Sequence, residues 1–322
     1  MPGAQMNGSG RGQAAAIRSR VRLPVIVAPM FLISSPEMVI AAARAGIIGA
    51  FPAASARTTE AFEEWCRIIV EALGEDGLWA VNLILHPSYS RFGDELALIT
   101  RYRPPLVITA LGSPRRVLTE VHGYGGSVFA DVASPSQARK AVDAGADGLV
   151  LVCAGAGGHT GRYSPFAFAS AVRAFWNGPL VLSGGIADAA GVLAAEMLGA
   201  DFAYMGTRFL ACHESLGSAE RKAMTVSAGL EDIVTSAAIT GIPANWMMPS
   251  IVAAGFPVDQ LDTKGKIDFD AATSRSKAWK DIWGAGHGVG TITRTEAVAE
   301  IVEQLGRDYL ALRQRRGGAI QT

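Results

Sequence analysis

The chain has 322 residues, of which 49% are hydrophobic and 18% charged, and its formal net charge at pH 7 is 0. This composition is typical of a globular protein whose core is large enough for one big domain or two small ones. The neutral charge and the lack of a Lys/Arg-rich run argue against nucleic acid or an anionic membrane as the main partner. The sequence has no run of 18 apolar residues, so no membrane-spanning helix is expected.

Three scattered cysteines without a CxxC pair favour a reduced, cytoplasmic compartment. The first 20 residues are rich in Gly, Ala and Ser and lack the apolar segment of a secretory signal. Residues 1–20 are therefore expected to form a flexible tail.

Short β-rich segments alternate with helical segments from residue 24 onward. The expected strands are 24–30, 47–51, 79–85, 105–111, 127–133, 148–154, 179–185 and 202–210. The segments between them open on a Ser or Asp and close on Gly, as helices do. Nearly continuous apolar strands alternating with helices indicate a parallel sheet covered by helices. Eight such units favour an α/β fold of the (β/α)₈ TIM barrel type over an open doubly wound sheet.

The alternation stops after the eighth expected strand. Residues 220–287 are helical and irregular in pattern, and the last segment is again typical of an amphipathic helix. We therefore expect a barrel formed by 21–219 and 288–322, with 220–287 as a helical lid subdomain. Such an insertion would cover the C-terminal mouth, where barrel active sites lie.

Glycines follow the seventh and eighth expected strands, in "SGGIADAAG" (183–191) and "MGTRFLA" (205–211). In barrels, the loops after these strands commonly bind phosphate through backbone N–H groups. The candidates are Ser183, Gly184, Gly185, Gly206 and Thr207. The alternative interpretation is that the glycines only form tight turns.

Two further segments carry polar groups near strand ends. Asn82 lies in an apolar strand, and its amide suits either the polar edge of an aromatic cofactor or a structural bond between strands. The loop "CAGAGGHTG" after the sixth strand is rich in glycine, which permits close backbone approach or positive φ. His159 is the one group in that loop that could move a proton near neutral pH.

The motifs "PVIVAPM", "VNLIL", "CAGAGGHTG", "SGGIAD" and "MGTRFLA" occur in the order found in the nitronate monooxygenase family. The resemblance covers residues 22–215, with a weaker match in "GHGVGTI" (286–292). That family binds FMN non-covalently in a (β/α)₈ barrel. The resemblance implies that FMN is held by Ala28, Pro29, Met30, Asn82, Asp131, Ala156, Gly157, Gly158 and the phosphate-site residues. It also implies that His159 is the catalytic base or the electrostatic partner of the substrate anion.

Some positions depart from the family pattern or are weaker candidates. Asp131 stands where better-known relatives often carry a lysine, and an ionised carboxylate there would repel an anionic reduced flavin unless it is displaced, protonated or paired with Arg. Weaker candidates for the substrate pocket are His86, Trp246, Met247 and His287. For Trp246 and Met247 a packed helical core is an equally good interpretation. The basic residues at 264–280 are interpreted as a solvated face.

The favoured function is FMN-dependent oxidation of alkyl nitronates with molecular oxygen, on a small-molecule substrate and without a metal. The alternative is an NAD(P)H-dependent quinone or enoyl-thioester reductase on the same flavin barrel, because such relatives bind nicotinamide without a Rossmann fingerprint. Other classes are a phosphosugar isomerase or lyase without redox chemistry, and a non-catalytic ligand-binding regulator. Use of NAD(P)H and formation of a homodimer stay open.

Overall fold

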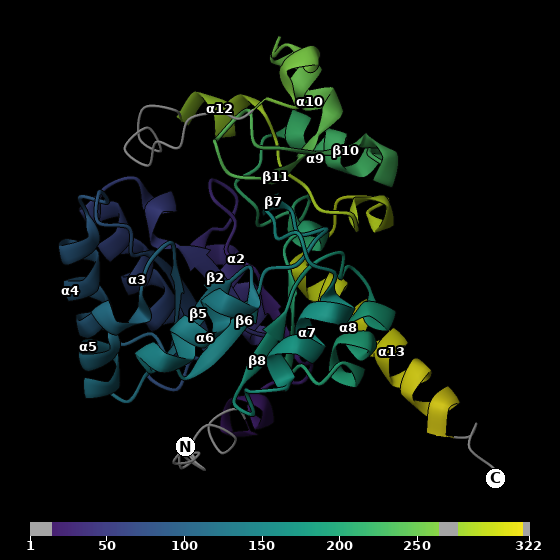
Figure 1. The fold of residues 1–322 in the computed structure, drawn as a ribbon. Helices are drawn as coiled ribbons and strands as arrows, with labels where there is room; N and C mark the ends of the chain where they lie inside the picture. The colour runs from purple at the N-terminus through teal and green to yellow at the C-terminus, as the bar shows by residue number, and fades with distance from the viewer. Residues whose placement is uncertain (1–14, 264–275, 318–322) are drawn as a thin grey trace.

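The computed structural model describes residues 15–263 and 276–317, and in it eight parallel strands form a barrel (Figure 1). These strands are β1 (Val25–Val27), β2 (Gly49–Pro52), β3 (Trp79–Ile84), β4 (Leu106–Ala110), β5 (Ser127–Val132), β6 (Gly148–Leu151), β8 (Leu180–Leu182) and β9 (Phe202–Met205). Their order is β1-β9-β8-β6-β5-β4-β3-β2. The ring closes between β1 and β2 by a parallel bridge, where the Val27 amide donates to the Ile48 carbonyl at 2.8 Å. The predicted TIM barrel is confirmed.

Helices connect the strands and surround the barrel (Figure 1). They are α2 (Pro36–Arg44), α3 (Thr59–Leu73), α4 (Phe92–Tyr102), α5 (Leu118–Gly123), α6 (Pro135–Ala144), α7 (Pro165–Arg173), α8 (Ala189–Met197) and α13 (Val298–Gly317). Short 3₁₀ turns are η1 (Ala53–Ala56), η2 (Pro114–Arg116), η3 (Thr207–Phe209), η4 (Leu230–Asp232), η5 (Val258–Gln260) and η6 (Val289–Thr291). The last helix, α13, packs against α8 and α2, so it completes the outer ring.

The helices begin where the sequence places capping residues. The Ser35 hydroxyl accepts from the Met38 amide at 3.0 Å, and Ser134 and Asp188 cap α6 and α8 in the same way. At its other end α6 stops at Gly145, whose φ of 97° lies in the left-handed region. These local signals set where the helices begin and end.

The barrel interior follows a period of two along each strand. Its lower layers are apolar and include Ile26, Ile108, Phe129, Val181 and Phe202, all of them buried. Residues 15–19 form a helical turn, and its Ile17 side chain is buried against this interior. The remainder of the expected tail, residues 1–14, lies outside the described residues.

The segment from 220 to 287 differs from the helical lid that the sequence pattern predicts. It contains α9 (Ala219–Ser227), α10 (Met248–Ala253) and α12 (Ser276–Asp281), but also the strands β10 (Ile233–Ser236) and β11 (Ala244–Met247). β11 pairs with β10 on one side and, on the other, with β7 (Gly158–His159) from the loop after β6. The short strands are stabilised by this pairing with a loop distant in sequence, which a local pattern does not reveal. In Figure 1 these elements lie above the barrel, on the side opposite the N-terminus.

Part of the insertion, residues 264–275, lies outside the described residues and includes most of the basic stretch noted in the sequence. In the described ranges, no helix has both the length and the apolarity that crossing a bilayer requires.

Candidate functional site

A cavity of about 840 Å³ opens at the carboxyl ends of the barrel strands. Its floor is made by the next inward-facing residues after the apolar layers of the barrel. These residues are Ala28, Asn82, Ala110, Asp131, Val152, Ser183 and Tyr204. Residues of the insertion, among them Ile242 and Trp279, form part of its upper wall. The position matches the active-site end of TIM barrels.

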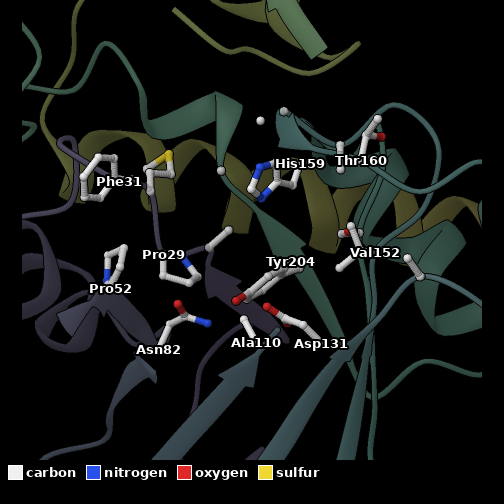
Figure 2. A pocket seen from close by; sticks show the side chains of 18 of the residues that line it. Pro29, Phe31, Pro52, Asn82, Ala110, Asp131, Val152, His159, Thr160 and Tyr204 are labelled. Carbon is white, nitrogen blue, oxygen red and sulfur yellow. The ribbon is translucent and has the colours of Figure 1, made fainter. Parts of the chain in front are cut away.

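Polar groups on this floor have unused hydrogen-bonding capacity. The Asn82 amide nitrogen donates to the Ile108 carbonyl at 3.2 Å, so this amide does tie β3 to β4. Its carbonyl oxygen receives no hydrogen bond from the described residues. Oδ1 of Asp131 and the hydroxyl of Tyr204 are buried and also lack partners in the described chain. Figure 2 shows Asn82, Asp131 and Tyr204 together beneath His159. Buried polar atoms normally have partners, so this floor is suited to a ligand with polar edges.

The environment of Asp131 opposes its ionisation. Burial raises the pKa of Asp131 to about 7, because a carboxylate in this cavity is removed from bulk water. Burial, and then the nearby Asp131, raise the pKa of the Tyr204 phenol well above its usual value. Below about pH 7 this end of the floor is therefore neutral, and both groups can donate hydrogen bonds.

His159 is held at the cavity wall by the insertion. It pairs with Ala244 of β11, and the Asn245 amide side chain donates to the Ala156 carbonyl at 2.7 Å. Its ring meets Trp279 edge to face, with the ring centres 5.5 Å apart. The imidazole has accessible surface because it faces the cavity, yet protein surrounds it on the other sides. This surrounding lowers the pKa of His159 to about 4, so the ring is neutral at pH 7.

Four glycine-containing segments meet at one side of the cavity. The Gly286 amide donates to the Thr207 hydroxyl oxygen at 2.8 Å, which leaves that hydroxyl hydrogen available as a donor. A Cβ at Gly157 would lie 2.7 Å from the Gly286 nitrogen, so the backbones are in direct contact. Gly184 and Gly185 have φ values of 105° and 71°, which favour glycine. The Gly185 amide already donates to the Gly155 carbonyl at 3.2 Å, so it is not a free phosphate donor here.

Comparison of the sequence with known protein families identifies the family of this chain. A family model described as nitronate monooxygenase matches residues 79–308, which is more than half of the chain. The chain belongs to the nitronate monooxygenase family. A nitronate monooxygenase from Paraburkholderia phytofirmans is 31% identical over 231 residues, covering 66% of this chain and 63% of that protein. The match thus spans less than two thirds of that relative's length.

The chain is also similar to a dehydrogenase and to a solved oxidase structure. An indene-carboxyl-CoA dehydrogenase from Rhodococcus jostii is 27% identical, covering 69% of this chain and 62% of that protein. The crystal structure of nitroalkane oxidase from Streptomyces ansochromogenes superimposes with a TM-score of 0.83 at 22% identity. It covers 94% of this chain and 99% of that one, and supports the fold alone.

The residues present fit the FMN that the sequence resemblance implies. Partnerless polar atoms lie on the floor, and glycine backbones converge with the Thr207 hydroxyl at one side. The structure brings all the residues expected around the cofactor into one cavity wall. They are Ala28, Pro29, Met30, Asn82, Asp131, Ala156, Gly157, Gly158, Ser183, Gly184, Gly185, Gly206 and Thr207, with His159 beside them.

The four weaker pocket candidates lie outside this wall, which corrects their expected positions. Trp246 and Met247 are fully buried, and the Trp246 ring packs on Trp279 with centres 4.5 Å apart. Trp246 thus supports the residue that contacts His159. The His86 ring nitrogen Nδ1 forms a hydrogen bond with the Ser88 hydroxyl at 2.7 Å. His287 is exposed, although its amide donates to the Gly155 carbonyl at 3.0 Å.

Sequence reasoning missed Tyr204 and Arg221, and for the segment 284–288 it had only the weaker family match at 286–292. Tyr204 lies two residues before Gly206 in β9, and the period of two along this strand would have placed it in the barrel. The segment 284–288 reaches the phosphate side only through the folded insertion. Arg221 also lines the cavity, from a helix whose pattern is that of an ordinary amphipathic surface helix.

Proposed function

We propose that this protein oxidises alkyl nitronates with molecular oxygen and uses FMN to do so. The observation that carries the proposal is the neutral His159, held at the wall of a cavity whose floor presents Asn82, Asp131 and Tyr204. Membership in the nitronate monooxygenase family supports it. The match covers less than two thirds of the Paraburkholderia relative, so the activity of this chain is our proposal.

Several residues would hold the cofactor. Asn82, Asp131 and Tyr204 would meet its polar ring edge, and Thr207 with neighbouring glycine backbones would meet its phosphate. When bound, FMN supplies the capacity to accept electrons from the substrate and to return them to oxygen. Asp131 contributes a neutral carboxyl below about pH 7, and so it can donate a hydrogen bond without adding negative charge.

His159 has the role of handling the substrate's proton and anion. A nitroalkane's α-proton is acidic because the nitro group takes up the negative charge. A neutral imidazole nitrogen can accept that proton when the neutral nitroalkane enters, and its N–H can donate to an oxygen of the nitronate, which has already lost the proton. Pro29, Met30 and Phe31 also line the cavity and give it an apolar wall.

A second candidate function is an NAD(P)H-dependent reductase. Arg57 and Lys140 line the cavity, and neither forms an ion pair with another described residue. Two cations at a cavity mouth suit the phosphates of a dinucleotide or of a coenzyme A thioester. One relative carries the name of a CoA-ester dehydrogenase. In the sequence, the basic residues at 264–280 of the insertion are interpreted as a solvated face. Arg57 and Lys140, in contrast, belong to the barrel.

We expect the purified protein to be yellow and to release FMN rather than FAD on heating. The converging glycines and the Thr207 hydroxyl form one phosphate side next to the cavity floor, which fits the single phosphate of FMN. Mass measurement of the released flavin identifies it. Colourless protein that takes up no added FMN would contradict the proposal.

The reaction is tested by electron transfer from an alkyl nitronate to the bound flavin without oxygen. Reduction of the flavin by nitronate supports the monooxygenase, and reduction by NAD(P)H alone supports the second candidate.

A further inference from the structure

A buried arginine lines the cavity and has no role in the site described above. Arg221 is the third residue of α9, and its side chain is 7% exposed. Its Nε atom is buried without a hydrogen-bond partner. Among residues 15–263 and 276–317, no carboxylate pairs with its guanidinium. Arg221 therefore brings a positive charge to the cavity that no anion of the described chain neutralises.

Such a charge is costly to retain. An arginine stays protonated in proteins, and a buried unpaired charge opposes folding. The cost is visible in the pKa of Arg221, which burial lowers to about 10. Asp131 is the one acid in the described cavity wall, and it is largely protonated below about pH 7. A bound anion would offset this cost, whereas nothing in the described protein does.

The local structure fixes the backbone at Arg221. The Ser218 hydroxyl accepts from the Arg221 amide at 3.2 Å, and the Thr225 hydroxyl donates to the Arg221 carbonyl at 2.8 Å. The stem of the side chain passes close to Gly217, where a Cβ would lie 3.7 Å from Cδ of Arg221. The same Cβ would lie 3.3 Å from Ile33, just after the β1 turn that carries Met30. The start of α9 is therefore fixed before any ligand arrives, and the Arg221 side chain extends from it to the cavity.

We propose that Arg221 binds a planar anionic group of the substrate that has two oxygens. This group is either the nitronate itself, which rests on the proposed function, or a carboxylate on the same molecule. A guanidinium presents parallel N–H donors that match two oxygens in one plane. His159 is neutral and supplies no charge. The two residues thus have different roles: Arg221 neutralises the anion, and His159 donates a hydrogen bond to it or accepts the α-proton when a neutral nitroalkane enters.

Steady-state kinetics of the FMN-loaded Arg221→Met variant test the proposal. Loss of a charged hydrogen-bonding partner is expected to raise KM about 10- to 100-fold with kcat nearly unchanged. A rise with both ethyl nitronate and propionate 3-nitronate means that Arg221 binds the nitronate. A rise with propionate 3-nitronate alone means that it binds the carboxylate. An unchanged KM for both substrates overturns the proposal.

Lys222→Met is the matched control. Lys222 is the next residue of the same helix, but its ammonium donates to the His213 carbonyl at 3.2 Å and it does not line the cavity. This variant should keep the wild-type KM. Arg221→Lys should recover part of the loss, because it restores the charge without the two parallel donors.

Binding of propionate gives a readout that needs no turnover. Calorimetry of the FMN-loaded protein should detect propionate with wild type and not with Arg221→Met. The variant should unfold at the same temperature as wild type or higher, because it removes a buried unpaired charge. Equal propionate binding by both proteins, or a variant that unfolds at clearly lower temperature, assigns Arg221 a structural role and overturns the proposal. The propionate-binding test does not use turnover, so it still decides the role of Arg221 if the protein does not oxidise nitronates.

Discussion

Replacing His159 with alanine is expected to lower the turnover of a neutral nitroalkane, whose α-proton must be removed, by about 10²–10⁴-fold, the usual contribution of a general acid or base. The fold and the FMN content should not change. The loop is held by backbone pairing with β11 and by the Asn245 bond to the Ala156 carbonyl, neither of which uses the imidazole. Oxygen uptake with a neutral nitroalkane, together with the flavin-to-protein absorbance ratio, checks both parts.

His213→Ala serves as the control for this experiment, because His213 is exposed and lies outside the cavity wall. It should retain wild-type turnover. The lowered pKa of His159 adds a pH test: its contribution should be complete at neutral pH and decline as pH falls toward about 4. Loss of FMN from His159→Ala would show that the residue supports the cofactor instead of the chemistry.

Replacing Asp131 with asparagine is expected to stabilise the flavin-free protein at pH 8 and to have little effect near pH 4. The carboxyl ionises near its usual pKa of 3.8 when unfolded and at about 7 when folded. Between these values the folded state binds more protons than the unfolded state, so wild-type stability falls as pH rises from 4 to 7. Above about pH 7 the carboxyl is ionised in both the folded and the unfolded state, so its ionisation lowers the stability no further.

The size of the Asp131 effect follows from the same shift. A pKa raised from 3.8 to about 7 corresponds to about 4 kcal/mol at most. Water in the cavity screens the charge, so we expect about 1–3 kcal/mol at pH 8. Urea unfolding of both proteins at pH 5 and pH 8 measures the difference, and the comparison cancels the other titrating groups.

Asp76→Asn, in an exposed turn, is the control and should leave the pH dependence of stability unaltered. If Asp131→Asn destabilises the protein equally at both pH values, Asp131 is ionised and partnered in the folded state. The neutral polar floor proposed for the site would then be wrong.

The barrel and much of its site could be predicted because they depend on local signals. Apolar strands, Ser and Asp caps and glycines at strand ends recur at each unit, so Gly184 and Thr207 could be placed together without any structure. Asn82 and Asp131 followed from their positions near strand ends. Tyr204 also follows the period of two in β9, but the sequence pattern does not distinguish its side chain from the apolar residues around it.

The rest depends on contacts between distant segments. Strand β11 forms because it pairs with β7, about 85 residues earlier, and this pairing aims His159. Trp246 resembled a pocket residue in the sequence, yet it packs behind Trp279. Arg221 could not be found because its neighbours in sequence are those of a solvated helix. Its burial appears only once α9 lies against the barrel mouth.

The central claim is that nitronates, and not reduced nicotinamides, are the electron donors at this cavity. Anaerobic mixing of the FMN-loaded protein with an alkyl nitronate, NADH or NADPH, each separately, tests it by the loss of flavin absorbance. We predict rapid loss with the nitronate, because its anion can bind beside His159 in this cavity, and slow or no loss with either nicotinamide. Rapid loss with NADH or NADPH and none with nitronates would contradict the claim and assign the protein to the reductases.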